Sequence, residues 1–420
     1  MGDRLRPVWA AVLCAVSFTG VWAIQRATHV TLVDVTVYRA AGWTVRRGGD
    51  LYAMRATPDR LPMTYPPFAG LLFVPLTWLG AGTVRAAAIP ANLLLTVPLA
   101  ALSLRLAGRR PRAATVLVVA ALVVWTEPVW STLRHAQVNL LLTVLVLWDL
   151  TRRPGRRSAG VGIGLAAGIK LTPALFVVLL AAAAVAARGR GQPYLRTARV
   201  AAGTFAATVA VPALVLPRDS LDYWTGVAFA ADRPGFAENV ANQSLRGVLA
   251  RGEHSGEPGA AWLCLALAVG VAGLAIALAA LFAGDRLPYS TAWAAVACGV
   301  TALLISPVSW THHWVWDVPM LVLLASEAGR RGDPRWAGAA AAAALAFSSF
   351  PMWALPHGPG RLELHENAAQ LLVSAAYPLT GLAFLALAAT VAIRSLRRPP
   401  PLARRPPSGE RPASVAGSMG

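Results

Sequence analysis

The 420-residue chain is 56% hydrophobic, only 14% charged, and carries a formal net charge of +19. A soluble domain has roughly a quarter of charged residues, so the composition excludes an ordinary soluble domain and favours a polytopic membrane protein. The positive charge is almost wholly arginine, in short clusters between apolar runs, and Lys170 is the only lysine. That distribution is typical of cytoplasmic loops and argues against nucleic-acid binding. Cys14, Cys264 and Cys298 lie within apolar runs and predict neither disulfides nor a metal site.

Apolar runs recur along the whole chain. A bilayer core requires about 20 helical residues. The candidate runs are residues 8–24, 84–106, 113–129, 138–150, 160–187, 200–216, 260–283, 289–305, 314–325, 336–350 and 368–393. The first run is expected to be a span, although "VWA" also resembles the cleavage site of a signal peptide.

Arginine clusters orient these runs. Residues 4–6, 105–112, 152–157, 188–199, 330–335 and 394–405 are expected to face the cytoplasm. The first span then places residues 28–65 outside, and one crossing must return the chain to the cluster at 105–112. The short apolar run at 66–79 is therefore predicted not to span, but to form a helix on or in the outer face.

The run at 160–187 has arginine clusters on both sides, so it must enter the membrane and return. We predict a break at "KLTP", residues 170–173, because proline interrupts a helix. Such short half-spans are tolerated only where other helices bury them or where they line a wet cavity. The fold class is thus an all-α polytopic membrane protein with about twelve spans and both termini inside.

Polar and aromatic motifs collect on the expected outer face. They are residues 30–67, "WTEPVWSTLRHAQVN", residues 217–258 with "FAENVANQSLRG", "SPVSWTHHWVWD" and "PMWALPHGPGRLELHEN". A transporter or flippase would place polar groups near the midplane in repeats related by pseudo-symmetry. This one-sided pattern with no visible internal repeat favours an enzyme that acts at the outer surface.

Asp34, in "LVDVTVY", is the candidate general base. It follows the first span among apolar neighbours, so its carboxylate is expected near the membrane surface, where it can accept a proton. An ordinary solvated loop acid is the alternative. Asp50 and Asp59 stand beside glycine or proline and are better explained as turn residues.

His312 and His313 precede the aromatic run "WVW". An interfacial aromatic belt explains the tryptophans. It explains two adjacent histidines less well, because neighbours on a helix point about 100° apart and at most one faces a given cavity. A functional role is therefore expected for at least one of them. Zinc is not expected, because only Asp317 stands near them as a further ligand.

Lys170 is an ionisable group inside an apolar run, which is costly and typical of a functional site, although it could also reach the interface. Phosphate is a natural partner for its point charge. Arg134 and His135, with Gln137 and Asn139, form a second cationic cluster at the start of a span. A helix start with an interfacial arginine is the alternative interpretation there.

Three further candidates lie in the outer loops. Tyr65, before Pro66 and Pro67, favours a turn that fixes the surface helix. Asn239, Asn242 and Gln243, with Glu238 and Arg246, could hydrogen-bond a polyol. A base at the surface, cations near the hydrocarbon and an amide-rich loop together indicate a lipid phosphate that carries a sugar.

Six motifs in order resemble glycosyltransferase family 87. They are "VDVTVYRAAGWTVRRGGDLY", "LPMTYPPFAGLLFVPL", "HAQVNLLLTVLVLWDL", "GLAAGIKLTPALF", "ENVANQSLRGVL" and "SPVSWTHHWVW". The resemblance implies a GT-C fold with amphipathic helices in the first outer loop. It also implies an actinobacterial enzyme that takes a sugar from polyprenyl phosphate, as do the α-1,2-mannosyltransferases and an arabinofuranosyltransferase of the family.

The resemblance also implies site residues. The family's D-x-x-V-Y motif falls on Asp34, Val37 and Tyr38, which makes Asp34 the base; Val35 replaces the family's frequent leucine. His312 and His313 are implied near the donor phosphate or the acceptor, and Lys170 is our candidate for the phosphate. The implied reaction inverts the anomeric carbon and requires no metal or other cofactor.

The predicted partners are a polyprenyl-phosphate-sugar donor, a glycolipid or glycan acceptor and membrane lipid. The predicted location is the plasma membrane with an outward-facing site. "HHWVW" favours mannose over arabinofuranose, and the retained Asp34 and His313 argue against an inactive member. Residues 1–396 are expected to form one domain, followed by a disordered cytoplasmic tail at 397–420 rich in proline and arginine.

Overall fold

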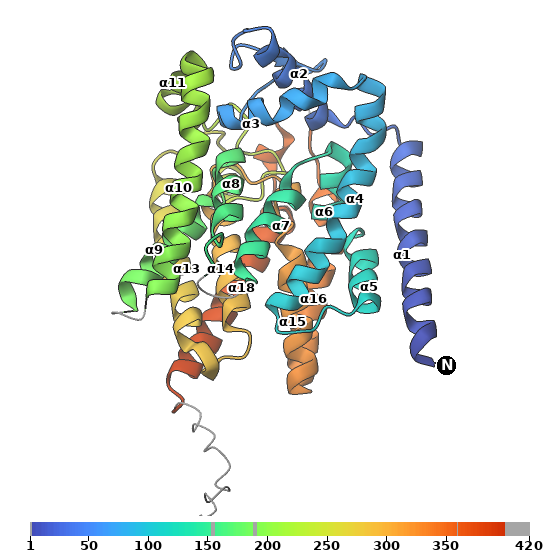
Figure 1. The fold of residues 1–420 in the computed structure, drawn as a ribbon, viewed down its shortest axis with the longest axis vertical. Coiled ribbons are helices and arrows are strands. Elements are labelled where there is room, and N and C mark those ends of the chain that lie inside the picture. Colours follow the sequence, from blue (N-terminus) through green and yellow to red (C-terminus); the bar gives the residue numbers. More distant parts are fainter. Residues whose placement is uncertain (1, 153–155, 188–190, 359, 400–420) are drawn as a thin grey trace, which may run out of the picture.

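The computed structural model describes residues 2–152, 156–187, 191–358 and 360–399, with the side chains of residues 2–6 outside that description. The described residues form eighteen α-helices, six 3-10 helices and one two-stranded hairpin. Most helices stand side by side along the long axis of the molecule (Figure 1). The tail predicted at 397–420 lies outside the described residues from residue 400 onward.

The first half of the chain forms α1 (Gly2–Ala27), α2 (Val33–Arg46), β1 (Arg55–Ala56), β2 (Leu61–Pro62), α3 (Pro67–Phe73), η1 (Val74–Trp78), α4 (Ala81–Leu106), α5 (Ala113–Val123), α6 (Glu127–His135), α7 (Asn139–Leu150), α8 (Val161–Ile169), α9 (Ala174–Ala186) and α10 (Gln192–Val215). The two strands pair antiparallel, with Arg55 opposite Pro62.

The second half forms α11 (Pro217–Thr225), η2 (Val227–Phe229), α12 (Leu245–Gly252), α13 (Ala261–Ala283), η3 (Gly284–Arg286), α14 (Ser290–Ile305), η4 (Thr311–His313), α15 (Asp317–Arg331), α16 (Pro334–Ser348), η5 (Pro351–Ala354), η6 (Leu362–His365), α17 (Ala368–Ser374) and α18 (Ala376–Leu396). The N-terminal end of α1 and the C-terminal end of α18 lie at the same end of the molecule, whereas α2, α3 and α11 lie at the other (Figure 1).

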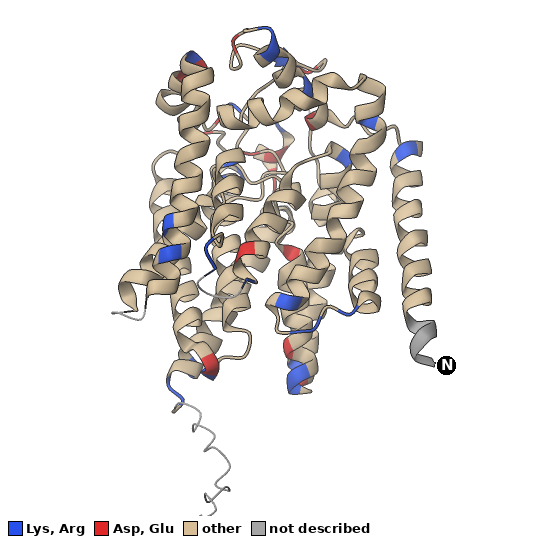
Figure 2. Ribbon diagram, in the orientation of Figure 1, with Lys and Arg blue, Asp and Glu red and all other residues tan. Residues whose placement is uncertain are grey.

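Several helices have the length and composition of membrane spans. Among the described residues these are Pro7–Ala27, Ala81–Leu106, Gln192–Val215, Ala261–Arg286 and Ala376–Leu396, and the bent pair α5–α6 makes six. Lysine and arginine residues lie mainly toward the two ends of the helices, as a bilayer requires (Figure 2). Other predicted spans, including α7, α9 and α14, are 10–17 residues long, so the count of about twelve remains a prediction.

One predicted span was wrong in shape. The run at 113–129 is not one helix: α5 ends at Val123, and α6 begins at Glu127 with its axis bent by 77°. Pro128 explains the bend, because it has no N–H for the carbonyl of Val124 and its ring clashes with that carbonyl.

The loop between α1 and α4 carries α2, the hairpin, α3 and η1. α2 buries Val35, Tyr38 and Ala41. Gly42 lets α2 approach the next helix closely, because a Cβ at this position would lie 2.4 Å from the carbonyl oxygen of Phe73. α3 and η1 lie across the end of the bundle (Figure 1). Residues 66–79 thus form a short helix of the kind predicted for a segment that does not span.

The predicted break in the run at 160–187 is confirmed. α8 ends at Ile169, Lys170 is extended with φ −150°, and α9 begins at Ala174. Pro173 removes the hydrogen bond to the carbonyl of Ile169, which is where α8 stops. The break leaves Lys170 outside both helices.

A row of glycines presses α8 onto α10. A Cβ at Gly164 would lie 2.5 Å from the carbonyl oxygen of Ala201, and one at Gly168 would lie 2.2 Å from Oγ1 of Thr208. Glycines four residues apart let two helix backbones approach closely. This contact fixes the C-terminal end of α8, and with it Lys170.

The tryptophans of "WVW" lie in the core. Trp314 has no exposed surface and Trp316 is 8% exposed. Trp314 packs against Tyr377 and Phe347, and Trp316 stacks on Phe176 at 5.2 Å. The aromatic-belt interpretation is therefore wrong for these two residues, because they pack against other helices and anchor the segment that contains the histidines.

Candidate active site

A cavity of about 290 Å³ lies where five parts of the chain meet. These parts are the loop that contains α2 and α3, the turn between α6 and α7, the α8–α9 break, residues 223–234 and the segment between α14 and α15. The cavity's polar lining includes Asp34, Tyr65, Gln137, Lys170, Thr172, Arg233 and His313. It thus brings the predicted base, the predicted phosphate ligand and one predicted histidine to one site.

Asp34 stands in the first turn of α2. A carboxylate is stabilised there by the positive end of the helix dipole. Burial nevertheless raises the pKa of the Asp34 carboxyl to about 7, although a hydrogen bond from Gln137 and the charge of Lys170 both act to lower it. The group can therefore both hold and release a proton near neutral pH, which suits a general base.

Gln137 is held by two phenols. The hydroxyls of Tyr38 and Tyr65 each donate to Oε1 of Gln137 at 2.8 Å. Burial raises the pKa of both tyrosines above the usual value, so both hydroxyls keep their protons. With Oε1 occupied, Nε2 of Gln137 is the atom left to donate to Asp34. Tyr38 does not line the cavity; it orients the amide that orients the carboxylate.

Lys170 joins three elements. Its ammonium donates to Oδ1 of Asn139 at 3.0 Å and contacts Nε2 of His313 at 2.8 Å. An ammonium has only donors, so Nε2 of His313 accepts and the imidazole proton lies on Nδ1. Lys170 also lies 5.5 Å from the ring centre of Tyr65. The cation is thus held at the cavity wall by neutral partners, with Asp34 as the nearby charge.

The second predicted histidine has a different position. The ring of His312 is buried between those of His313 and His135, with centroids 4.8 and 5.0 Å away. Its carbonyl oxygen accepts from Oγ1 of Thr132 at 3.0 Å and from Nδ2 of Asn139 at 2.9 Å. His312 therefore supports His313 from behind and does not line the cavity.

Two residues of the predicted cationic cluster also lie away from the cavity. Arg134 is exposed on α6. His135 bonds the carbonyl of Ser131 through Nδ1 at 2.8 Å. The structure thus brings Lys170 and His313 to the cavity, but not Arg134, His135 or His312. α6 turns Arg134 and His135 away from the cavity, and the ring of His312 in η4 packs between those of His135 and His313.

The predicted polyol-binding amides serve the fold instead. Asn242 donates to the carbonyl of Ala237 and accepts from the N–H of Ser309. Gln243 donates to the carbonyls of Val240 and Ser374. Asn239 accepts from the N–H of Ala241. None of the three amides lines the cavity; they fasten the loop before α12 to the segment that carries His313.

Arg233 is a cavity residue that the sequence did not single out. Its guanidinium donates to the carbonyls of Met63 at 3.0 Å and Tyr52 at 2.5 Å. Arg233 stands directly before Pro234, within the polar segment at residues 217–258. This polar residue beside a proline was the sequence signal that could have identified it. Asp50 accepts from the N–H groups of Tyr52 and Ala53, as expected of a turn residue.

A smaller, more apolar cavity of about 40 Å³ adjoins the site. It shares Lys170, Thr172 and His313 with the larger cavity and continues along Leu142, Val146, Phe176, Leu303 and Trp316. The cation therefore stands between a polar chamber and an apolar one. Within residues 2–152, 156–187, 191–358 and 360–399, no three His, Cys, Asp or Glu side chains come together as a metal site.

Comparison with known proteins identifies the family. The model of glycosyltransferase family 87 matches residues 63–307. The matched range begins after Asp34 and ends before His312, so it includes neither Asp34 nor the two histidines.

Characterised relatives extend the match. The chain is 34% identical over 335 residues to the polyprenol-phosphate-mannose-dependent alpha-(1-2)-phosphatidylinositol pentamannoside mannosyltransferase of Mycobacterium tuberculosis (strain CDC 1551 / Oshkosh), which covers 76% of this chain and 73% of the relative. It is 33% identical over 352 residues to the polyprenol-phosphate-mannose-dependent alpha-(1-2)-phosphatidylinositol mannoside mannosyltransferase of Mycolicibacterium smegmatis (strain ATCC 700084 / mc(2)155), with 77% and 76% covered.

No solved structure matches the chain. The family match covers more than half of its length, and the relatives match at over 30% identity across about three quarters of it. The resemblance seen in the motifs is thereby confirmed: the chain belongs to glycosyltransferase family 87, and it is a membrane glycosyltransferase.

Proposed function

We propose that the protein transfers mannose from polyprenyl-phosphate-mannose to a glycolipid of the phosphatidylinositol mannoside type. The names of the relatives state this donor and this class of acceptor. The observation in this chain that supports them is the cavity in which Asp34 faces Lys170 and His313, with an apolar chamber beyond the cation. A lipid-linked sugar phosphate requires three environments in this order: a base beside the sugar, a cation beside the phosphate and an apolar cavity for the start of the lipid chain.

The reaction is a single displacement. Asp34 takes the proton of the acceptor hydroxyl while the hydroxyl oxygen attacks the anomeric carbon of the donor sugar. The bond between that carbon and the phosphate oxygen breaks, and polyprenyl phosphate leaves with both bonding electrons. Lys170 faces the oxygen that gains charge, and the product has the opposite anomeric configuration. Tyr38, Tyr65 and Gln137 hold Asp34 in place.

The architecture we propose is of the GT-C type, with about twelve crossings and amphipathic helices in the first outer loop. The end that carries α2, α3 and the cavity faces outside, and both termini are cytoplasmic. Short arginine-rich turns at the opposite end support this orientation.

Reconstitution tests the activity. Purified full-length protein receives polyprenyl-phosphate-[14C]mannose and a phosphatidylinositol mannoside, and the product is analysed by mass and by linkage. We expect one added mannose in α-1,2 linkage. Transfer from polyprenyl-phosphate-arabinofuranose but not from the mannose donor would indicate the arabinofuranosyltransferase of the family instead. Passage of labelled donor across vesicles without glycoside formation would indicate a flippase.

Labelling tests the orientation. In a variant without its native cysteines, single cysteines replace Thr57 in the hairpin loop and Arg109 beyond α4. A membrane-impermeant maleimide is expected to label position 57 in intact cells and position 109 only after permeabilisation. The reverse pattern would place the site in the cytoplasm and would remove the proposed orientation while leaving the transfer reaction intact.

A further inference from the structure

A second, larger cavity lies at the opposite end of the molecule from the active site. Its volume is about 620 Å³, and it is lined by six arginines and two aspartates. The arginines come from four regions. Arg286 lies in η3, Arg330 and Arg331 at the end of α15, and Arg335 at the start of α16, whereas Arg394 lies in the last turn of α18 and Arg398 just beyond that helix. All six line the same cavity. Arginines that only set the orientation of a protein in the membrane would be expected along single loops, without converging on one cavity.

Most of this positive charge is not neutralised by the protein. Glu327 is buried and pairs with Arg330 at 2.5 Å and with Arg331 at 2.7 Å. Asp333 accepts from the backbone N–H of Arg335 as the cap of α16. Within the described part of the chain, Arg286, Arg335, Arg394 and Arg398 have no carboxylate within ion-pair distance, and Nε of Arg286 is buried without a hydrogen-bond partner.

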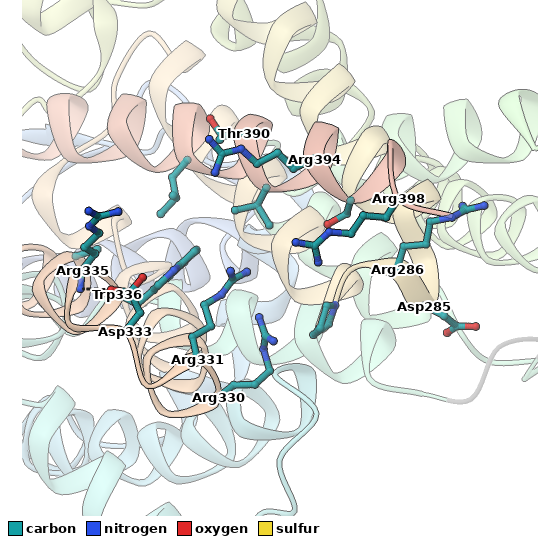
Figure 3. Close-up of a pocket in the computed structure, with 15 residues that line it drawn as sticks. Asp285, Arg286, Arg330, Arg331, Asp333, Arg335, Trp336, Thr390, Arg394 and Arg398 are labelled. Carbon is teal, nitrogen blue, oxygen red and sulfur yellow. Dashed lines mark hydrogen bonds between the residues drawn. The ribbon is translucent and has the colours of Figure 1, made fainter. Parts of the chain in front are cut away.

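The walls of the cavity are of two kinds. Figure 3 shows Arg331 of α15 and Arg398, which follows α18, reaching toward the same space. Thr390 and Ser395 add hydroxyls, whereas Leu387, Val391 and Ala339 form an apolar wall between α16 and α18. The ring of Trp336 lies beside these residues, with the guanidinium of Arg331 4.3 Å from its centre. A cationic mouth above an apolar wall matches a phosphate attached to an acyl chain.

We infer that this cavity binds an anionic phospholipid, with its phosphate among Arg394, Arg398 and Arg286 and an acyl chain along Leu387 and Val391. Basic pockets between membrane helices are suited to such headgroups. The inference is independent of the sugar and of the acceptor that the active site uses, because it involves none of the active-site residues.

Lipid titration of the full-length protein in detergent, followed by native mass spectrometry, tests the inference. Phosphatidylglycerol, cardiolipin and phosphatidylcholine are compared on the wild type and on Arg394→Gln/Arg398→Gln. We expect the wild type to bind the two anionic lipids in preference to phosphatidylcholine. We expect the double variant to bind them roughly thirtyfold more weakly, because each arginine is worth about a factor of five.

The matched control removes the same charge at the same end. Arg109→Gln/Arg110→Gln alters two exposed arginines outside the cavity and is expected to leave lipid affinity unchanged. Equal weakening in both double variants, or equal binding of phosphatidylcholine, would overturn the inference. Arg394→Lys/Arg398→Lys keeps the charge and should retain most of the binding, which separates a lost contact from a misfolded helix end.

A soluble polyanion is the competing source of phosphate. Inorganic pyrophosphate is titrated in the same detergent while the unfolding temperature is followed, because a ligand that binds only the folded state raises it. We expect phosphatidylglycerol to raise the unfolding temperature and pyrophosphate not to. If pyrophosphate alone raised the unfolding temperature, the cavity would bind a soluble anion, and the proposal of a bound phospholipid would be wrong.

Discussion

The ammonium nitrogen of Lys170 lies 2.8 Å from Nε2 of His313, although 143 residues separate the two in the sequence. The break between α8 and α9 frees the lysine, and the buried Trp314 anchors the histidine's segment. The pair presents one positive charge with a defined direction to the cavity. In the proposed reaction this charge faces the departing phosphate.

Lys170→Met is therefore expected to lower the turnover number by about 10² to 10³-fold, the usual cost of one preorganised charge-stabilising group. His313→Gln should lower it less, because the lysine remains. The double variant should be little worse than Lys170→Met alone, since residues that act as a unit are not additive. Steady-state transfer rates at saturating donor measure all three. Activity of Lys170→Met within threefold of the wild type would contradict the role.

The Asp34 carboxyl predicts a pH profile. Because burial raises its pKa to about 7, the fraction of proton-accepting carboxylate falls by about tenfold for each pH unit below that value. The turnover number should rise with pH as Asp34 loses its proton near pH 7. Asp34→Asn should lose about 10² to 10⁴-fold in rate and should also lose this rising limb. If the residual activity of Asp34→Asn still rose with pH through about 7, the titrating group would be a residue other than Asp34.

Stability distinguishes this loss from misfolding. The raised pKa of Asp34 means that its protonated form is favoured in the folded state, so its contribution to stability is full at low pH and is lost as pH rises through about 7. Asp34→Asn cannot ionise. Its unfolding temperature should equal that of the wild type only below about pH 4, where Asp34 is protonated in both states, and should exceed it at pH 8. A lower unfolding temperature at pH 8 would contradict the buried-carboxylate account.

The sequence predicted much of the helical framework, because its signals are local. Proline at position 173 marks the end of α8 four residues earlier, and the structure ends that helix at Ile169. The bend between α5 and α6 was missed although Pro128 carried the same signal. The apolar run continues across that proline, so the prediction followed the apolar composition and placed one uninterrupted span there.

The site was harder to predict, because contacts over long sequence separations set it. Asp34, Gln137 and Lys170 were each visible as polar groups in apolar surroundings, but only the fold brings them to one cavity. Asn242 and Gln243 show the opposite difficulty, because both amides bond backbone groups in the fold. A buried amide that satisfies the backbone has the same sequence appearance as one that binds a sugar.

The glycine contact between α8 and α10 gives a packing prediction. In Gly164→Val the new Cβ would lie 2.5 Å from the carbonyl oxygen of Ala201, so the helices must separate. We expect a loss of about 1 to 3 kcal/mol in unfolding free energy and a loss of activity, because Lys170 directly follows the last residue of α8. Gly203→Val on α10 is the control, since nothing lies within 4 Å of a Cβ there. Thermal unfolding measures both variants. If they lost equal stability, the loss would come from the helix propensity of valine, and the close contact between α8 and α10 would not explain it.

Glu127 gives a final prediction about what supports the histidine segment. Oε1 accepts from the hydroxyl of Ser131 at 2.6 Å and from the indole of Trp353 at 3.1 Å, and Oε2 accepts from the hydroxyl of Tyr377 at 3.0 Å. One side chain thus ties α6 to two segments more than 200 residues away.

In Glu127→Leu all three donors lose their acceptor. Each unsatisfied buried group costs about 1 to 3 kcal/mol, so the unfolding temperature and the transfer rate should both fall. The rate falls because α6 also holds the carbonyl of His312 through Thr132. Glu127→Gln should be tolerated, because its amide oxygen keeps two donors and its amide nitrogen donates to the rotatable hydroxyl of Tyr377. If the glutamine variant were as damaged as the leucine variant, the negative charge itself would be required, and hydrogen bonding alone would not explain the buried Glu127.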